Sequence, residues 1–273
     1  YASSYDSAFP FSHDTYNGIY AASDGNVYYV LSSASKDQGG KIYCFEPSRK
    51  KISLCGDLTE ICGEKDSHAI PQGKSHVTFI EFDGKLFFGT HIGYYDMVNG
   101  METMGVLTMN MDVTRGIIYG ITWPTGYFFR YDVRKRDMKN FGPVSHGGEN
   151  GKGNHFRVLC RSIAINPKDG IAYFSTSEGN IMKCSADADE LGLVGEKILK
   201  KDYFGHYDPS TPGHMGYNWR QIFWHEPSGL FYGIHGNSGY LFSFNPNNND
   251  VALLQRLTSV PSRKSGMYDQ FSY

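Results

Sequence analysis

The sequence of 273 residues lacks the charge and the apolar runs that mark two large classes of protein. It has 26 lysines and arginines against 28 aspartates and glutamates, a formal net charge of −2, so no overall field attracts it to nucleic acid or to an anionic membrane surface. Its longest apolar runs, such as "VTFIEF" and "VYYVL", are far shorter than the roughly 20 residues of a membrane-spanning helix. We therefore expect neither a nucleic-acid partner nor a membrane partner.

Cysteine is scarce as well, and the familiar short motifs are absent. The five cysteines are an odd number, which excludes a framework in which every cysteine forms a disulfide within the chain. The chain contains no P-loop, GxGxxG, GxSxG or HExxH motif. The glycine-rich stretch "HGGENGKGNH" has no strand before it and no helix after it, so it lacks the context of a phosphate-binding loop.

Glycine and aromatic residues are abundant instead, and they recur in one pattern. The chain has 32 glycines, 20 tyrosines and 18 phenylalanines, a composition that favours strands and tight turns. Five segments alternate apolar and polar residues on both sides of a glycine turn, as β-hairpins do. They are "GIYAASDGNVYYVLSS", "HVTFIEFDGKLFFGTH", "VLTMNMDVTRGIIYGIT", "SIAINPKDGIAYFSTS" and "QIFWHEPSGLFYGIH", with turns at Gly25, Gly84, Gly116, Gly170 and Gly229.

The spacing of these turns predicts the architecture. Three hairpins continue into a third strand and a polar turn, which makes about four strands per repeat, and the turn glycines are 59, 32, 54 and 59 residues apart. Four-stranded repeats of this length are the blades of a β-propeller. We predict an all-β protein in which residues 1–273 form a single β-propeller domain, with seven blades in a complete chain. The alternatives are a β-sandwich or a different number of repeats.

Two places depart from the repeat. After "GTHIGYYDMVNGMETM" a third and a fourth strand are due, but the next hairpin begins at once, so we infer that half a blade is absent around Met104 and Gly105. The ending "SGMYDQFSY" resembles the first strand of a further blade that is truncated.

Alignment of the hairpins on their glycines predicts which residues meet at one end of the propeller. In a propeller blade the first strand begins, and the second strand ends, on the same rim. The residues so placed are His76, Arg161 and Arg220 at strand starts, His91, Thr122, Trp123 and His235 at strand ends, and Tyr127 and Tyr240 just beyond. Arginine pairs bidentately with carboxylates, imidazole removes protons near neutral pH, and aromatic rings stack on sugars. The predicted mouth therefore suits acidic sugars.

Each of these residues also has a structural interpretation. A histidine at a strand end can bond a turn, an arginine can bond carbonyls of a neighbouring blade, and a tryptophan can wedge between blades. A metal site is a further hypothesis: His155, Cys160 and His214 precede adjacent blades, and imidazole with thiolate suits a structural zinc. No compact CxxC or HxxxH pair supports it.

The blade repeat, the pair His76 and His91 across one hairpin, and the strand "WPTGYFFRYD" resemble the β-propeller polysaccharide lyases. The likeness is to ulvan lyases and, more distantly, to oligogalacturonide lyases. The resemblance implies a seven-bladed fold and cleavage of uronate polysaccharides by β-elimination. It also implies His76 and His91 at the catalytic centre and Tyr127 as proton donor or base.

The resemblance further implies an arginine that neutralises the substrate carboxylate. Arg157, Arg161 and Arg220 all precede or open inner strands, so the arginine is not assigned uniquely; we take Arg161 as the catalytic candidate. The substrate-binding candidates are Arg157, Arg220, His235, Trp123 and Tyr240. No cofactor is required beyond the hypothetical zinc. The expected partner is an acidic polysaccharide or oligosaccharide, and the expected location is secreted or periplasmic.

Two other functions stay open. Ordinary glycoside hydrolysis needs two carboxylates about 5 to 10 Å apart. Glu178 is the only acid that the alignment brings clearly to the mouth, so ordinary glycoside hydrolysis is disfavoured. A rhamnosidase-like propeller, which has a histidine in place of the carboxylate pair, escapes this argument. A non-catalytic carbohydrate-binding propeller is the third interpretation. The prediction is an enzyme, a uronate polysaccharide lyase with an ulvan-like substrate.

Overall fold

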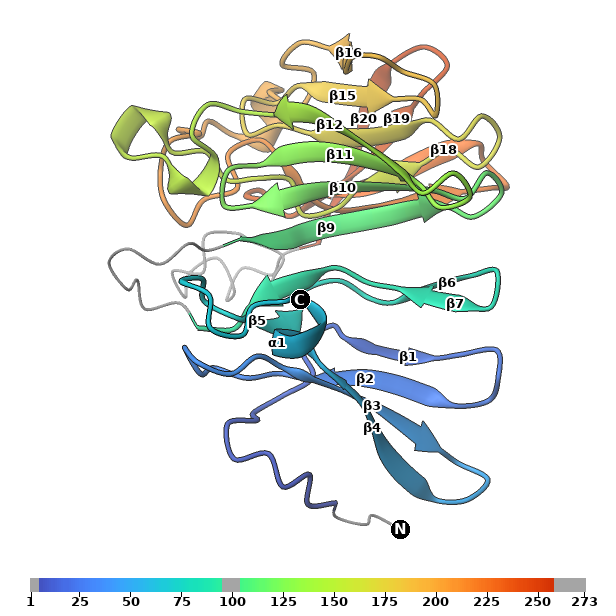
Figure 1. The fold of residues 1–273 in the computed structure, drawn as a ribbon. Helices are drawn as coiled ribbons and strands as arrows, with labels where there is room; N and C mark the ends of the chain where they lie inside the picture. Colours follow the sequence, from blue (N-terminus) through green and yellow to red (C-terminus); the bar gives the residue numbers. More distant parts are fainter. Residues whose placement is uncertain (1–4, 95–103, 258–273) are drawn as a thin grey trace. The chain divides into compact units, whose positions relative to one another are not determined.

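A computed structural model describes residues 5–94 and 104–257 (Figure 1). The chain divides into two compact units, Tyr1–Leu107 and Thr108–Tyr273, which we call the N-terminal and the C-terminal unit. The division falls inside strand β9 (Gly105–Asp112). No helix among the residues described is long and apolar enough to cross a membrane. The five cysteines are free thiols.

The N-terminal unit opens with one antiparallel four-stranded sheet. Its strands follow one another in chain order: β1 (Ile19–Ala21), β2 (Val27–Leu31), β3 (Lys41–Glu46) and β4 (Lys51–Asp57). A single helical turn, α1 (Leu58–Ile61), follows β4. It begins where Asp57 caps it, because the Asp57 carboxylate accepts a hydrogen bond from the Thr59 backbone N–H at 2.9 Å.

The second hairpin of this unit consists of two short paired segments. Strand β5 (Gln72–Ser75) pairs with β8 (Thr90–Ile92), and β6 (Ile80–Phe82) pairs with β7 (Lys85–Phe87). Within the described residues no third or fourth strand joins this hairpin before β9. The blade that the sequence predicts to be incomplete therefore has its first two strands, paired as a hairpin. Residues 95–103, next to the inferred gap, lie outside the described residues.

The C-terminal unit contains three antiparallel sheets of four strands each, again built from consecutive strands. The first contains β9, β10 (Ile117–Trp123), β11 (Tyr127–Asp132) and β12 (Asp137–Pro143). The second contains β13 (Ala164–Ile165), β14 (Ala172–Ser175), β15 (Ile181–Cys184) and β16 (Gly192–Gly195). The third contains β17 (Trp219–His225), β18 (Leu230–His235), β19 (Tyr240–Asn245) and β20 (Asp250–Arg256). Three 3-10 turns lie in the connections: η1 (Gly148–Asn150), η2 (Gly153–His155) and η3 (Asp202–Phe204).

The fold is a β-propeller, as predicted. Consecutive antiparallel sheets of four strands are its blades. The seven-blade count and the single domain over residues 1–273 stay predictions. The segment "SGMYDQFSY" lies outside the described residues.

The predicted turns are confirmed by their backbone. Gly25, Gly84, Gly116, Gly170 and Gly229 all have positive φ, between 66° and 84°. An L-residue with a side chain rarely adopts this conformation, so glycine is the natural occupant. Each hairpin therefore turns where the sequence pattern places its glycine.

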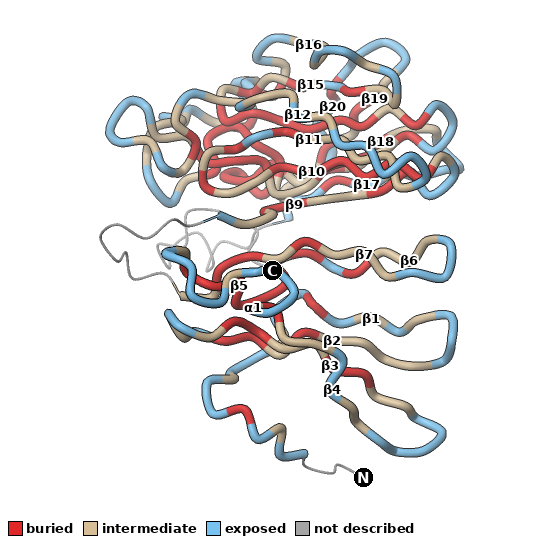
Figure 2. Tube along the Cα trace, viewed as in Figure 1, coloured by how far each residue is buried: buried red, intermediate tan, exposed pale blue. Residues whose placement is uncertain are grey.

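Aromatic packing holds the sheets of the C-terminal unit together. Tyr119, Phe128, Phe174, Trp219 and Phe242 come from all three sheets and share one buried cluster. The rings of Phe128 and Phe174 stack with centroids 4.6 Å apart. Figure 2 shows the buried stretch along β10 and the exposed hairpin turns. Burying such large rings between sheets accounts for the high aromatic content of the sequence.

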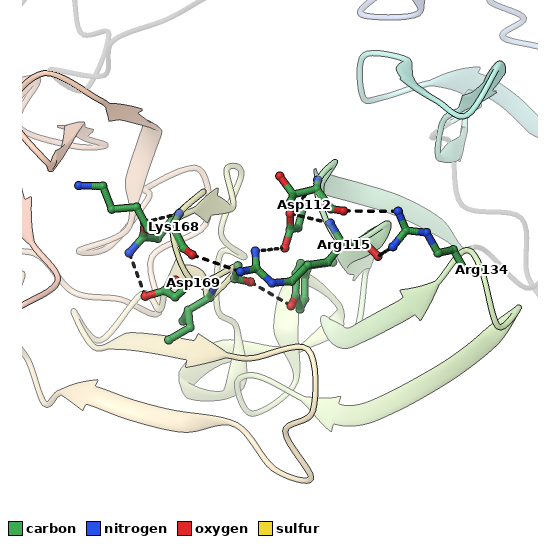
Figure 3. Close-up of polar contacts among 10 residues, drawn as sticks. Asp112, Arg115, Arg134, Lys168 and Asp169 are labelled. Carbon is green, nitrogen blue, oxygen red and sulfur yellow. Dashed lines mark hydrogen bonds and ion pairs between the residues drawn. The ribbon is translucent and has the colours of Figure 1, made fainter.

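A polar clasp joins neighbouring hairpin turns in the same unit (Figure 3). The buried Asp112 carboxylate accepts bonds from the backbone N–H groups of Thr114 and Arg115 and pairs with the Arg115 guanidinium at 2.9 Å. Arg115 also donates to the carbonyl of Lys168 in the next hairpin at 3.2 Å, and Arg134 donates to the Arg115 carbonyl at 3.0 Å. The clasp therefore links one blade to the next through a single buried carboxylate.

Replacing Asp112 with alanine should destabilise the C-terminal unit. The substitution removes the acceptor of two backbone N–H groups and the partner of Arg115, which costs about 2 kcal/mol for hydrogen bonds to a buried charge. Urea unfolding followed by tryptophan fluorescence measures the loss. Asp137→Ala, at an exposed position of β12, is the control and should change stability by less than about 0.5 kcal/mol. Equal stability of the two variants would contradict a structural role for the clasp.

Candidate functional site

The two histidines predicted to pair do lie together in the N-terminal unit. His76 directly follows β5, and His91 is the middle residue of β8. In the β5–β8 pairing, Lys74 is opposite His91 and Ser75 is opposite Thr90. The imidazole rings of His76 and His91 have centroids 4.9 Å apart and are tilted by 32°. The hairpin register therefore brings both rings to one place.

Backbone carbonyls fix the tautomer of both rings. Nδ1 of His76 lies 2.8 Å from the Leu107 carbonyl oxygen, and Nδ1 of His91 lies 3.0 Å from the Ile92 carbonyl oxygen. A carbonyl oxygen only accepts, so each Nδ1 carries the hydrogen. The neutral rings then hold their lone pair on Nε2, which is the basic nitrogen of each.

Two residues that the sequence reasoning missed complete this cluster. The ring of Tyr16, an exposed residue before β1, lies 5.1 Å from the ring of His76. The ammonium of Lys74 lies 4.2 Å from the centre of the Tyr16 ring, although Lys74 is only 7% exposed. We call Tyr16, Lys74, His76 and His91 the His–Lys cluster. It contains bases, a phenol and a cation.

One sequence signal pointed to Lys74. Alternate residues of a strand face the same side of the sheet, and directly opposite residues of paired strands are neighbours on that side. Lys74 is two residues before His76 and opposite His91 in the register, so strand alternation could have identified it. Tyr16 belongs to a loop outside the repeat and carried no such signal.

In the C-terminal unit the predicted Trp123 and Arg161 meet through a carboxylate that was not predicted. The Trp123 indole N–H donates to Glu149 at 2.9 Å, and the Arg161 guanidinium pairs with Glu149 at 2.7 Å. The Leu159 backbone N–H donates to the same carboxylate at 3.1 Å. Glu149 lies in the glycine-rich loop, where no periodicity marked it.

Arg157 is held in a similar way. Its Nε lies 2.5 Å from the Glu178 carboxylate, and its Nη1 donates to the carbonyls of Asn154 and Phe156. The guanidinium groups of Arg157 and Arg161 are therefore both paired with acids of the same chain. An anionic substrate would have to compete with those carboxylates.

The remaining rim candidates lie at strand ends or near them. Tyr127 opens β11 and is 39% exposed, and Tyr240 opens β19 and is half-buried, with the Arg256 guanidinium 5.1 Å from its ring. Arg220 is the second residue of β17, where the pairing register shifts. Since the His–Lys cluster and these residues belong to different units, their meeting at one mouth stays a prediction.

The predicted substrate contact of His235 is not supported by its surroundings. His235 is fully buried, its ring stacks on Phe204 at 4.3 Å, and its Nδ1 bonds the Ser238 hydroxyl at 2.9 Å. Burial lowers the pKa of this histidine from an ordinary 6.5 to about 3, while the Leu199 backbone acts in the opposite direction. His235 is a neutral packing residue.

The hypothetical zinc site stays a prediction, which the described residues do not support. No three histidine, cysteine, aspartate or glutamate side chains there are grouped to hold a metal. Cys160 is fully buried beside Ser175, and burial raises the pKa of its thiol, whereas His155 is exposed and lies near His146. Within the described residues, His155, Cys160 and His214 are thus not grouped as a ligand set.

A pocket of about 350 Å³ lies at the hairpin-turn end of the N-terminal unit, away from the histidine end of the same hairpin. Phe79, Leu86 and Phe88 supply apolar walls, and Asp24 and Glu81 supply carboxylates. Both carboxylates are already engaged: Glu81 accepts bonds from Ser23, and Asp24 accepts one from the Tyr28 hydroxyl at 2.8 Å. These bonds indicate a contact between adjacent blades rather than a reactive centre.

The buried His235 should make the protein sensitive to acid. Its folded pKa of about 3 lies below the unfolded value of 6.5. Between these values only the unfolded chain binds the proton, so the free energy of unfolding falls by about 1.4 kcal/mol per pH unit as the pH decreases. Urea unfolding at pH 7 and pH 4.5 measures the slope.

His235→Leu should flatten that slope, because leucine has no proton to gain. The control is His225→Leu, at an exposed position at the end of β17, which should keep the wild-type slope. Identical slopes in wild type and His235→Leu would show that His235 is not the acid-sensitive group.

Comparisons with known proteins support the β-propeller fold, but they do not assign the chain to a family. No family model matches the chain, and no curated protein matches it. Among solved structures, the Dos1 propeller matches with a TM-score of 0.53 and 12% identity over 89% of this chain and 60% of that one. A putative 6-phosphogluconolactonase from Bacteroides uniformis matches with a TM-score of 0.49 and 11% identity over 89% of this chain and 72% of that one. A luciferin-regenerating enzyme matches with a TM-score of 0.45 and 11% identity over 91% of this chain and 78% of that one.

The chain spans only part of several of these relatives. It covers 44% of a Bacteroides thetaiotaomicron protein of unknown function and 60% of the Dos1 propeller. At these identities the similarity concerns the fold alone. The comparisons thus agree with the strand order: the chain has the fold of a β-propeller.

Proposed function

We propose that this protein is a polysaccharide lyase that cleaves uronate-containing polysaccharides by β-elimination, with an ulvan-like substrate favoured. The observation that supports the proposal is the pair of imidazoles at 4.9 Å, His76 and His91, each with its lone pair on Nε2. The Tyr16 ring packs on His76, and the Lys74 ammonium lies over the Tyr16 ring. An enzyme for such a polymer would act outside the cytoplasm, secreted or in the periplasm.

The reaction needs three groups. The proton on C5 of a uronate is weakly acidic, so a base must remove it while a cation neutralises the adjacent carboxylate. The electron pair of the C5–H bond forms the C4=C5 double bond, the C4–O4 bond breaks, and O4 takes up a proton. In the proposal Nε2 of His76 or His91 takes the C5 proton, and no cofactor takes part.

A tyrosine would return the proton to O4. The resemblance to propeller lyases points to Tyr127, which is partly exposed at the start of β11. Tyr16 is a second candidate because its ring lies against His76. Tyr16→Phe and Tyr127→Phe distinguish the two, since only loss of the donor hydroxyl should lower the elimination rate.

Elimination fits the described residues better than hydrolysis by two carboxylates. Ordinary glycoside hydrolases use one acid as proton donor and a second as base or nucleophile. Glu149 and Glu178, two acids that contact predicted rim residues, are both bound to arginines at 2.7 and 2.5 Å. The His–Lys cluster contains two imidazole bases, His76 and His91.

The test is to incubate the protein with ulvan, with pectin fragments and with glucuronate-capped polysaccharides while following the ultraviolet absorbance of the unsaturated uronate. Wild type should produce that absorbance with at least one of them. His76→Ala and His91→Ala should each lower the rate by roughly 100-fold or more, as loss of a general base does. His225→Ala, at an exposed histidine, should leave the rate unchanged.

Three other results would contradict the lyase proposal. New reducing ends without the absorbance would indicate a rhamnosidase-like hydrolase. Retained polysaccharide binding with neither signal would indicate a carbohydrate-binding propeller. Full activity in both histidine variants would remove the pair from the mechanism.

A further inference from the structure

We infer that Cys44 and Cys55 form a redox site: a low-molecular-weight disulfide, such as oxidised glutathione, converts the two thiols into a disulfide that fastens strand β4 to β3. Both cysteines belong to the N-terminal unit, on these neighbouring strands, and both are free thiols in the structure. Neither thiol takes part in the proposed lyase chemistry, so the redox site stands apart from that function.

The register of β3 and β4 places the two side chains on one face of the sheet. Cys44 lies opposite Ser53, and Cys55 follows Ser53 by two residues. Side chains two apart on a strand face the same side, so Cys55 is the diagonal neighbour of Cys44 on that face. On the other side of Cys44, the residue opposite it in β2 is Tyr28. Strand register therefore makes the two cysteines neighbours.

A β-bulge in β4 shortens the diagonal between them. Leu54 lies opposite Tyr43 and Gly56 lies opposite Ile42, so Cys55 is the extra residue of the bulge. Diagonal neighbours in a regular ladder are about 7–8 Å apart, which is at the limit of what a disulfide can span. The bulge sets two residues of β4 against one of β3 and so reduces the offset along the strand.

The two thiols already interact. Burial raises the pKa of the Cys55 thiol, and a hydrogen bond with the Cys44 thiol raises it further. A disulfide requires the sulfurs to approach to about 2.05 Å. Strand β4 is the last strand of its four-stranded sheet and pairs with β3 alone in that sheet. A small shift of β4 toward β3 therefore breaks no second ladder.

Exposure sets the order of the reaction. Cys55 is exposed, whereas Cys44 is only 7% exposed. The Cys55 thiolate attacks the external disulfide first: its sulfur bonds to one half of the oxidant, and the other half leaves as a thiolate. The Cys44 thiolate then attacks the Cys55 sulfur and displaces the second half. Both cysteines are oxidised, and the oxidant is reduced to two thiols that take up the two cysteine protons.

Cys62 is an exposed cysteine of the same unit and provides an internal comparison. Its thiol forms a hydrogen bond with Thr90 and lies near the Glu64 carboxylate. In an unfolded chain Cys62 would be the preferred partner of Cys55, because it is 7 residues away and Cys44 is 11 residues away. The folded register, rather than proximity in the sequence, selects Cys44.

The test treats the reduced, native full chain with oxidised glutathione at pH 8.5, where thiolate is more abundant, and maps the products by peptide mass spectrometry. Wild type should give a cross-linked pair of peptides that joins Cys44 to Cys55, and dithiothreitol should reverse it. Cys55→Ser should give no such cross-link and should leave the buried Cys44 unmodified. The control Cys62→Ser should form the cross-link at the wild-type rate.

Cys44→Ser separates the two steps of the reaction. Glutathione should stay attached to Cys55 in this variant, because the thiolate that displaces it is absent. In wild type the same adduct should be at least about tenfold less abundant, since the second step removes it. Cys44→Ala gives the same readout if the serine variant does not fold.

Two results would overturn the redox site. One is a glutathione adduct that persists on Cys55 of the wild type as it does in Cys44→Ser. The other is a Cys55–Cys62 cross-link as the main product in native buffer, which is the product of an unfolded chain. Neither result depends on polysaccharide cleavage, so failure of the lyase proposal and failure of the redox site are distinguishable.

Discussion

The turn glycine of each hairpin is the constraint on which the rest of the structure depends. Gly84, with a φ of 66°, closes the β6–β7 turn, where Ile80 lies opposite Phe87, and farther down the hairpin the register shifts by two residues, so that Ser75 lies opposite Thr90. The pairing of β5 with β8 places Lys74 opposite His91. Because side chains alternate along a strand, a slip of one residue would turn them to the other face. The chemistry of the cluster is therefore a consequence of strand register.

Features that follow from local periodicity could be predicted from the sequence, and features that follow from distant contacts could not. The β-propeller fold, the glycine turns and the approach of His76 to His91 all come from alternation about a turn. Tyr16 and Glu149 belong to loops, where no period relates a residue to its neighbours in space. Their contacts, with His76 and with Trp123 and Arg161, arise from segments far apart in the sequence.

Equivalent repeat positions can also have different surroundings. The sequence alignment places His91 and His235 at equivalent ends of the second strand of a hairpin and predicts both at the rim, His91 as a catalytic residue and His235 as a substrate-binding residue. His91 is 1% exposed and contacts another imidazole, whereas His235 is 0% exposed and stacks on Phe204 from η3. Burial lowers the pKa of His235 to about 3 and so keeps this ring neutral. Repeat alignment identifies a rim residue but not what covers it.

The arginines show the same limit of repeat alignment. An arginine in a sequence carries a charge whose partner is unknown, and here two of the three candidates already bind acids. The two histidines lie on or beside a single pair of strands, β5 and β8. Proton abstraction requires the base to be held to within a fraction of an ångström. Paired strands meet that requirement better than loops do, so the N-terminal unit holds the bases that carry the proposed proton transfer.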